Sequence, residues 1–322
     1  MADAEAIEKK KNEKRKKLTL GTHHILILSL VVLGSLFSTL SRDFYSSYNL
    51  ISMLTNMSFL GLSAIGFCVN LIGGEVDISI GANIALTSVV TAYGFEAGLP
   101  ISVCILAGLM VGVVMGAVNG VVIAGFKANS LIVTLGTMSI AQGIAYTMTG
   151  GLAILVMEDV LGFFGRGRIG PMPFPIIVLV LFTALFTVVV NFSKFGRRVQ
   201  AVGSNATVAF LSGIRVKRVK FAGLMICGVM TSISGLMMAS MSAVGMPQHG
   251  IGQEFPIISA VILGGASLSG GKGSVIGSII GILIISLIYN GLTMLNIPSY
   301  TVEMIRGLIL ILIVASYERR KR

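Results

Sequence analysis

Long apolar runs separated by short polar segments dominate the pattern of this chain. A transmembrane helix needs about 20 consecutive, mostly apolar residues, and the runs predict ten spans. They lie at approximately 24–41, 50–72, 80–97, 101–125, 130–150, 174–191, 220–243, 256–268, 274–294 and 301–317. The spans at 80–97 and 256–268 are short and suit broken or re-entrant helices, so eight crossings remain an alternative. The predicted fold class is all-α, a polytopic transmembrane helical bundle.

Basic residues at the flanks of the apolar runs predict the topology. Seven Lys and Arg residues lie in 9–17, seven in 194–220 and four in 319–322. Because basic loops stay on the cytoplasmic side, both chain ends are expected inside, and the number of spans is expected to be even. We therefore expect a basic cytoplasmic tail at 1–22, a transmembrane domain at 23–318 and a basic cytoplasmic end at 319–322.

The composition agrees with a membrane protein and argues against two other classes. The chain is 54% hydrophobic and 11% charged, which is too apolar for a soluble domain of 322 residues. The net charge of +11 is typical of some nucleic-acid-binding proteins, but its placement beside spans assigns it to topology, so no nucleic-acid partner is expected. Cys68, Cys104 and Cys227 stand alone in apolar runs, which indicates core residues and no disulfide.

The basic loop at 194–220 contains no acidic residue and carries a short helix candidate. Ser204 and Asn205 begin it, residues 206–211 form its body and Gly213 ends it, since hydroxyl and amide side chains start helices and glycine stops them. A capped helix in a cytoplasmic loop is typical of a docking element. The pattern therefore predicts a soluble partner at this loop.

Glycine recurs at every fourth position of one predicted span. The four residues are Gly108, Gly112, Gly116 and Gly120. Residues spaced by four share one face of a helix, and the missing side chains let another helix approach closely. We expect these glycines to pack helices inside the chain, with a contact to another subunit or a gate as the alternative.

Polar residues inside or between the spans are candidates for a solute pathway. The candidates are Glu75, Asp77, Asn83, Asn119, Gln142 and Asn290. An unsatisfied amide in lipid is costly, so these side chains are expected to face the interior, and hydrogen bonds between helices are the alternative role. For the two carboxylates, a turn or a cap formed by Asp77 and Ser79 competes with solute contact. A neutral, hydrogen-bonding interior suits a polyhydroxylated solute better than an ion.

Catalytic chemistry has little support in this sequence. The three histidines, His23, His24 and His249, have no metal-binding spacing. A phosphate-binding loop ending at Lys272 would need glycine at 266 and a hydroxyl residue at 273, where the chain has Ala266 and Gly273. We therefore expect a protein that is not an enzyme, has no metal site and binds no ATP of its own.

Four motifs together resemble a known family, the integral-membrane permease subunits of ABC importers in the ribose-type sugar branch. They are Gly74-Glu75-Val76-Asp77-Ile78-Ser79-Ile80-Gly81, then 131–137, then Gly203-Ser204-Asn205 with 211–214 and 216–220, and finally 263–267 with Gly270-Gly271-Lys272-Gly273. The resemblance runs from about residue 50 to 310. The chain departs from it at Gln142, where relatives often have arginine, and at Thr207 and Phe210 in the helix candidate.

The resemblance implies a multi-pass protein of a bacterial cytoplasmic membrane and a set of partners. These are a cytoplasmic ATPase subunit, which would hold ATP and Mg²⁺, an extracytoplasmic solute-binding protein, and a second permease that is identical or a sister subunit. The ATPase-docking residues it implies are Ser204, Asn205, Ala206, Ala209, Leu211, Ser212, Gly213 and Ile214. The implied function is import of a sugar or sugar-like solute.

Two other functions remain open from the sequence. An ion-coupled secondary transporter would need titratable groups deep in the bundle, and the spans offer few besides Glu75, Asp77, Glu254 and Glu303. A branched-chain amino-acid permease of the same superfamily would need charged partners for the carboxylate and amine of its solute. The sequence does not distinguish the sugars from one another.

Overall fold

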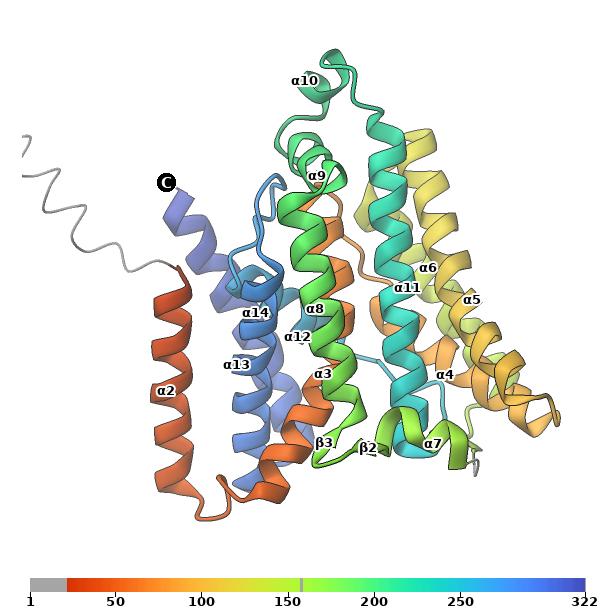
Figure 1. Cartoon of the computed structure of the whole chain (residues 1–322), viewed down its shortest axis with the longest axis vertical. Coiled ribbons are helices and arrows are strands. Elements are labelled where there is room, and N and C mark those ends of the chain that lie inside the picture. Colours follow the sequence, from red (N-terminus) through yellow and green to blue (C-terminus); the bar gives the residue numbers. More distant parts are fainter. Residues whose placement is uncertain (1–21, 157–158, 322) are drawn as a thin grey trace, which may run out of the picture.

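The computed structural model describes residues 22–156 and 159–321 and shows a bundle of helices standing side by side (Figure 1). Within these described residues, seven helical segments are long and apolar enough to cross a membrane. They are α3 (Ser47–Ile72), α5 (Ile101–Gly120) continued by the π-helix η1 (Val121–Gly125), α6 (Ser130–Thr149), α8 (Phe174–Phe192), α11 (Val216–Ser242), α13 (Val275–Met294) and α14 (Ser299–Lys321). The chain is therefore a mostly helical, membrane-spanning protein.

Three further helices correspond to the remaining predicted spans. They are α2 (Thr22–Leu40), α4 (Ile80–Glu96) and α12 (Glu254–Leu263). Each of the ten predicted spans thus has a helix in the structure, but α4 has 17 residues and α12 has ten. At 1.5 Å per residue, α12 is about 15 Å long, half the thickness of a bilayer core. The count of ten crossings stays a prediction.

The chain is mostly helical, and its described residues also contain two small antiparallel strand pairs. The strands are β1 (Ile154–Leu155) with β4 (Val244–Gly245), and β2 (Arg168–Ile169) with β3 (Met172–Pro173). A short helix, α7 (Asp159–Arg166), lies between β1 and β2 in sequence. A turn containing Gly170 at φ +61° joins β2 to β3, a conformation that glycine adopts easily. Pairs this short carry no apolar periodicity, so the pattern of spans did not reveal them.

Helices α3 and α11 form the centre of the bundle. The second half of α3 is buried continuously from Gly61 to Ile72, and its side chains there are small or aliphatic apart from Phe67 and Asn70. A Cβ built on Gly66 would lie 2.9 Å from the Cα of Cys227, so α3 and α11 approach at backbone distance. Close approach through small residues is the usual way in which membrane helices associate.

The glycine stripe of α5 faces this centre. Gly108, Gly112, Gly116 and Gly120 are all buried. A Cβ built on Gly112 would overlap the carbonyl oxygen of Gly228 in α11, and one built on Gly116 would lie 2.9 Å from the carbonyl oxygen of Leu224. The missing side chains therefore bring the backbone of α5 against α11 within one chain.

This packing predicts that Gly112→Ala destabilises the fold. The added methyl group has no space, and overpacking of this kind costs about 1–3 kcal/mol. The free energy of unfolding in mixed detergent and SDS micelles measures the effect. Gly136→Ala in α6 is the matched control, because a Cβ there meets no atom within 4 Å. Equal stability of the two variants would contradict the assignment of this stripe to internal packing.

Candidate functional site

Two short helices, α9 (Lys194–Ser204) and α10 (Ala206–Leu211), project from one end of the bundle (Figure 1). Asn205 separates them, and its side-chain oxygen accepts hydrogen bonds from the backbone N–H groups of Thr207 and Val208, both at 3.0 Å. This is a side-chain N-cap, which satisfies donors that the first turn leaves free. Gly213 follows at φ +80° and turns the chain towards α11. The predicted helix at 206–211 is present, whereas α9 was not predicted.

The exposed face of α10 is apolar. Val208, Phe210 and Leu211 are 56%, 68% and 78% exposed, whereas Ala209 is buried. Large exposed side chains on a short helix outside the bundle are typical of a contact surface. Of the sequence candidates, Ser204, Asn205, Leu211, Ser212 and Gly213 are exposed, Ala206 and Ile214 are half-buried and Ala209 is buried.

Sequence reasoning missed Val208 as a member of this surface and noted Phe210 only as a departure from the family. A helical wheel of residues 206–211 predicts which side chains are exposed, because residues three apart share one face of a helix. Ala206 and Ala209 therefore lie together on the inner face. The larger side chains between them point elsewhere, and the structure shows them in solvent.

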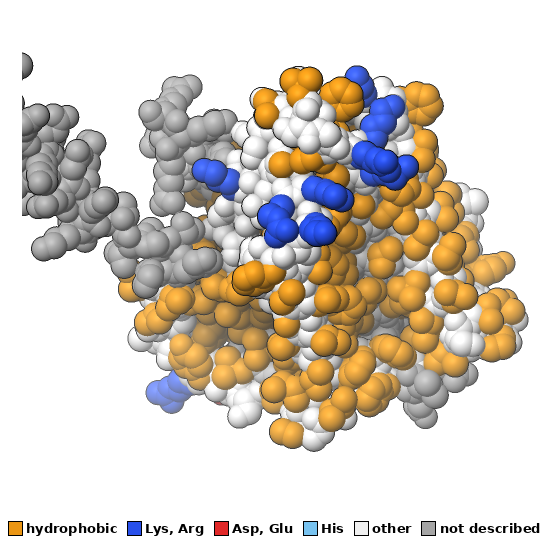
Figure 2. Space-filling view, turned by 45° about the horizontal axis from the view of Figure 1, so that its top comes forward, with side chains coloured by type: hydrophobic (Ala, Val, Ile, Leu, Met, Phe, Trp, Pro, Cys, Tyr) orange, Lys and Arg blue, Asp and Glu red, His pale blue; other side chains and the backbone are white. Residues whose placement is uncertain are grey.

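Basic side chains surround α10. Figure 2 shows Lys and Arg gathered at this end of the molecule and, among the described residues on the face drawn, no Asp or Glu. Lys217 donates a hydrogen bond from Nζ to the carbonyl oxygen of Gly125 at 3.1 Å, which ties α11 to the end of η1. The exposed basic residues of the predicted loop are Lys194, Arg197, Arg198, Arg215, Lys217 and Arg218. This surface is complementary to an acidic partner.

A pocket of about 760 Å³ lies between α10, the start of α11 and the turn after η1. Its walls include Ala206, Thr207, Phe210, Ile123, Ala124, Lys127, Ala128, Val216 and the basic residues from Arg215 to Lys220. One acid, Glu75, is also part of the lining. The pocket gives the docking candidate a concave side next to the exposed side chains of α10.

Behind α9, three glycine-containing segments that lie far apart in the sequence meet. A Cβ built on Gly203 would overlap the carbonyl oxygen of Ile72 and lie 2.6 Å from the nitrogen of Gly271. Gly271 donates its N–H to the carbonyl oxygen of Ile72 at 2.8 Å. A Cβ on Gly270 would lie 2.8 Å from the Cα of Gly74. We call Gly74, Gly203, Gly270 and Gly271 the glycine junction.

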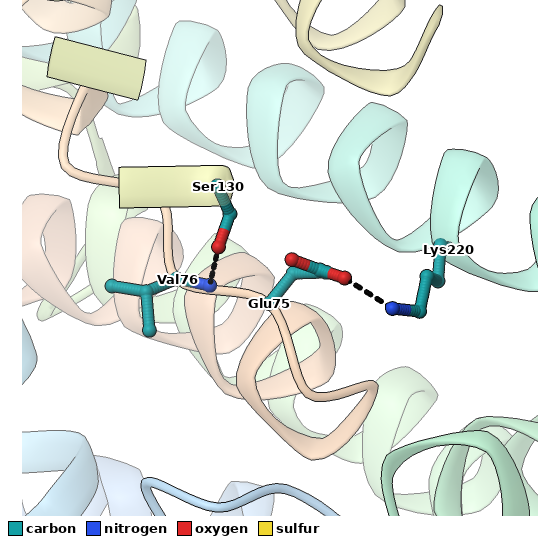
Figure 3. Close-up of polar contacts among 4 residues, drawn as sticks. All are labelled: Glu75, Val76, Ser130 and Lys220. Carbon is teal, nitrogen blue, oxygen red and sulfur yellow. Dashed lines mark hydrogen bonds and ion pairs between the residues drawn. The ribbon is translucent and has the colours of Figure 1, made fainter. Parts of the chain in front are cut away.

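The segment that leads away from the junction carries an ion pair. Glu75 Oε1 pairs with Lys220 Nζ at the start of α11, and their side chains are 9% and 23% exposed (Figure 3). The backbone N–H of Val76 donates to Ser130 Oγ in α6 at 3.4 Å. Glu75 is thus held in place between α11 and α6 by a partly buried charge pair.

Asp77 makes a turn with Ser79, which is one of the two roles expected for this pair, whereas Ser79 makes no side-chain cap on α4. Asp77 Oδ1 accepts hydrogen bonds from the backbone N–H of Ser79 at 2.9 Å and from the Ser79 hydroxyl at 2.5 Å. Ser79 precedes α4 but makes no side-chain capping bond to it, because its hydroxyl is directed to Asp77. Asn119 donates to Ser79 Oγ at 3.2 Å and accepts from Thr137 at 2.8 Å. A polar chain therefore joins the 73–79 segment to α5 and α6.

The other pathway candidates lie apart from this chain of bonds. Asn83 donates to the carbonyl oxygen of Gly228 in α11 at 3.0 Å, and Gln142 donates to the carbonyl oxygen of Pro247 at 2.6 Å. Asn290 of α13 exchanges two hydrogen bonds with Asn49 of α3, at 3.0 and 2.8 Å. Asn290 is therefore at a different place in the bundle from the carboxylates.

Within the described residues, no group of three or more His, Cys, Asp or Glu side chains is placed to hold a metal ion. His249 is buried and its Nδ1 lies 3.3 Å from the Ser88 hydroxyl. The features brought together at the α10 end are an exposed apolar helix, a basic surface and a glycine junction.

The fold and this projecting helix define a polytopic membrane protein with a docking candidate on one end. Residues 49–314 match the family described as the branched-chain amino acid transport system / permease component. The match covers most of the chain, so the protein belongs to this permease family. No solved structure matches the chain.

Several curated relatives resemble the chain over nearly all of its length. The L-arabinose ABC transporter permease protein AraH of Azospirillum brasilense is 32% identical over 92% of this chain and 88% of the relative. The ribose import permease protein RbsC of Bacillus subtilis is 34% identical over 91% of this chain and 92% of the relative. RbsC of Escherichia coli K12 is 31% identical over 89% of this chain and 91% of the relative. The resemblance stated from the motifs is confirmed.

The ion pair predicts a coupling between Glu75 and Lys220 that a double-mutant cycle measures. Glu75→Gln and Lys220→Met each leave the other charge without its partner, so each single variant is expected to lower the free energy of unfolding. The loss of unfolding free energy in the double variant is expected to be smaller than the sum of the losses in the two single variants, by roughly 0.5–3 kcal/mol. Strict additivity of the two changes would show that the pair makes no net contribution.

Proposed function

We propose that this chain is the permease subunit of an ABC importer that carries a sugar or sugar-like solute of the ribose type into a bacterial cell. The observation that carries the proposal is the match to relatives named as ribose and L-arabinose permeases, which extends over about nine-tenths of the chain. The neutral amides inside the bundle support a solute that offers hydroxyl groups. A separate ATPase subunit drives the import.

In this proposal the chain crosses the cytoplasmic membrane ten times, and both of its ends are cytoplasmic. The tail at 1–22 and the basic end at 319–322 flank a transmembrane domain at 23–318. The concentration of Lys and Arg beside α10 supports a cytoplasmic position for that end of the bundle. The opposite end, which carries α7 and the strand pair β2–β3 (Figure 1), then faces outward.

Three partners follow from the proposed class. An ATP-hydrolysing subunit binds α10 and holds ATP and Mg²⁺. An extracytoplasmic binding protein delivers the solute to the outer end. A second permease, identical or a sister chain, completes the membrane part. The exposed Val208, Phe210 and Leu211 support the first contact, and the basic residues around them favour an acidic surface on the ATPase.

The glycine junction supports a physical route for coupling. A push on α10 reaches Gly203, which contacts the end of α3 at Ile72 and the turn at Gly271 without an intervening side chain. Packed backbones transmit displacement, because there is no flexible side chain to absorb it. Helix α3 ends beside this junction and helix α13 begins beside it. In this proposal a displacement of α10 therefore moves both helices, which extend across the membrane.

A permease for branched-chain amino acids is the second candidate, because the description of the matched family names that solute class. Uptake competition separates the two. In vesicles that contain the full importer and ATP, we expect neutral pentoses and hexoses to compete with the transported solute and leucine to leave it unaffected. Competition by leucine alone would favour the amino-acid permease. Uptake that persists without ATP and collapses with a protonophore would favour a secondary transporter.

The docking role predicts that Phe210→Asp separates this chain from its ATPase. The substitution removes the apolar contact area of Phe210. It also places a negative charge within the basic surface, which weakens the attraction between that surface and an acidic ATPase. Co-purification of the ATPase from detergent is expected to fall by roughly tenfold or more, as loss of about 1.4 kcal/mol of binding energy would give.

Leu152→Asp is the matched control for this prediction. Leu152 is also a large exposed apolar residue, 74% exposed, but it follows α6 at the end opposite α10. We expect Leu152→Asp to retain the ATPase at the parental level, with both variants inserted in the membrane in normal amounts. Retention of the ATPase by Phe210→Asp would overturn the assignment of α10 as the docking element.

A further inference from the structure

The pocket of about 760 Å³ beside α10 carries an excess of positive charge. Its basic lining residues are Lys127, Arg215, Lys217, Arg218 and Lys220, and its one acid is Glu75. Glu75 is already paired with Lys220. Lys127, Arg215 and Arg218 form no ion pair in the part of the chain that the structure describes. A concave site with this charge attracts an anion, because its walls concentrate the positive field.

The pocket lies where two membrane-spanning segments end. Ile123 and Ala124, in its wall, belong to the last turn of the segment Ile101–Gly125, and Val216 is the first residue of α11. Helix α10 forms the wall on the other side and projects beyond the bundle (Figure 1). Lipid phosphates lie just outside the hydrocarbon core, at the level where apolar spans end. The pocket is therefore at the depth of the lipid headgroups.

Apolar side chains beside the basic groups suit the acyl part of an amphiphile. Ile123, Ala124 and Ala128 line the pocket. Val121 and Phe126, which flank the first two of these residues in sequence, are 51% and 78% exposed. A free phosphate has no apolar part and would leave this surface in contact with water, whereas a phospholipid covers it. The combination of cations and apolar surface therefore favours a lipid over a soluble anion.

Lys127 adopts a backbone conformation that is uncommon for a residue with a side chain. Its φ angle is +59°, in the left-handed region. Strain of this kind is frequent at positions that hold a ligand. Lys217 Nζ donates a hydrogen bond to the carbonyl oxygen of Gly125 at 3.1 Å, which fixes the turn after η1 against α11. The turn that carries Lys127 is thus held at the wall of the pocket.

We propose that this pocket binds the phosphate headgroup of an anionic phospholipid from the cytoplasmic leaflet. Lys127, Arg215 and Arg218 hold the phosphate, and the apolar wall contacts the glycerol and the first acyl carbons. Basic pockets between membrane helices on the cytoplasmic side are a common basis for recognition of anionic lipids. The inference goes beyond the proposed function and shares with it only the cytoplasmic position of the α10 end.

Lipid titration followed by native mass spectrometry tests the proposal. The full chain, alone and in complex with its ATPase, is freed of lipid in neutral detergent. It is then titrated with phosphatidylglycerol or with phosphatidylcholine that has the same acyl chains. We expect one phosphatidylglycerol to bind roughly tenfold or more tightly than phosphatidylcholine. Millimolar inorganic phosphate is expected to leave the bound lipid in place, because it makes no apolar contacts.

Charge-matched variants locate the site. Lys127→Gln combined with Arg218→Gln removes two cations from the pocket and should weaken phosphatidylglycerol binding roughly 10- to 30-fold. Lys194→Gln combined with Arg198→Gln is the control, because both residues are exposed on α9 and lie outside the pocket lining. This pair should retain the parental affinity. Ala128→Phe fills part of the pocket without a change of charge, so it should also lower the affinity several-fold.

Any of four results would overturn the site. Equal binding of the two lipids, or equal loss of affinity in the two charge variants, would show that the pocket does not select the headgroup. Displacement by inorganic phosphate would assign the pocket to a soluble anion. Exclusion of phosphatidylglycerol from the complex, with loss of the ATPase in the Lys127→Gln and Arg218→Gln variant, would assign it to an acidic segment of the ATPase. These measurements use neither solute nor ATP hydrolysis, so they fail or succeed independently of the proposed import.

Discussion

The close backbone contact at the glycine junction is the constraint on which the rest of this structure depends. Gly203 has no space for a side chain against Ile72 and Gly271. Any larger residue would separate α9 from the end of α3 and from the turn before α13. Because Gly74, Gly270 and Gly271 adopt positive φ angles at the same place, two chain segments turn there against the end of α9. The projecting helix α10 is therefore connected to the membrane part through α9 and this junction.

The junction stands at one end of α3 and α13, and at their other ends both helices line a cavity of about 430 Å³. Helix α3 runs from Ser52, in the cavity wall, to Ile72 at the junction, a length of about 30 Å at 1.5 Å per residue. Helix α13 begins just after the turn at Gly271 and reaches the cavity at Asn290. A displacement of the junction thus has a direct mechanical path along both helices to the opposite end of the bundle. The ion pair of Glu75 with Lys220 holds α11 to the same end.

Much of the fold was predictable from hydrophobicity, because lipid requires long apolar helices and leaves a strong periodic signal. Every predicted span has a helix, and the caps Asn205 and Gly213 gave the limits of α10 correctly. The strand pairs and α9 were missed, since they are short and lie where apolar runs stop. The site was predicted less completely. Asn119, a pathway candidate, instead bonds to Ser79 and Thr137 inside the bundle. Which amide side chains face a cavity depends on the rotation of each helix about its axis, and a single sequence carries little information on that rotation. The pairing of Asn49 with Asn290 joins residues 241 positions apart and left no local signal.

The ratio of solute transported to ATP hydrolysed in a Gly203→Ala importer tests the central claim most directly. The added methyl group should loosen the junction, so the variant should retain its ATPase but transport roughly tenfold less solute per ATP, a loss in keeping with overpacking of about 1–3 kcal/mol. Gly125→Ala, at a glycine with no neighbour within 4 Å of a built Cβ, should keep the parental ratio. An unchanged ratio in Gly203→Ala would contradict coupling through this junction.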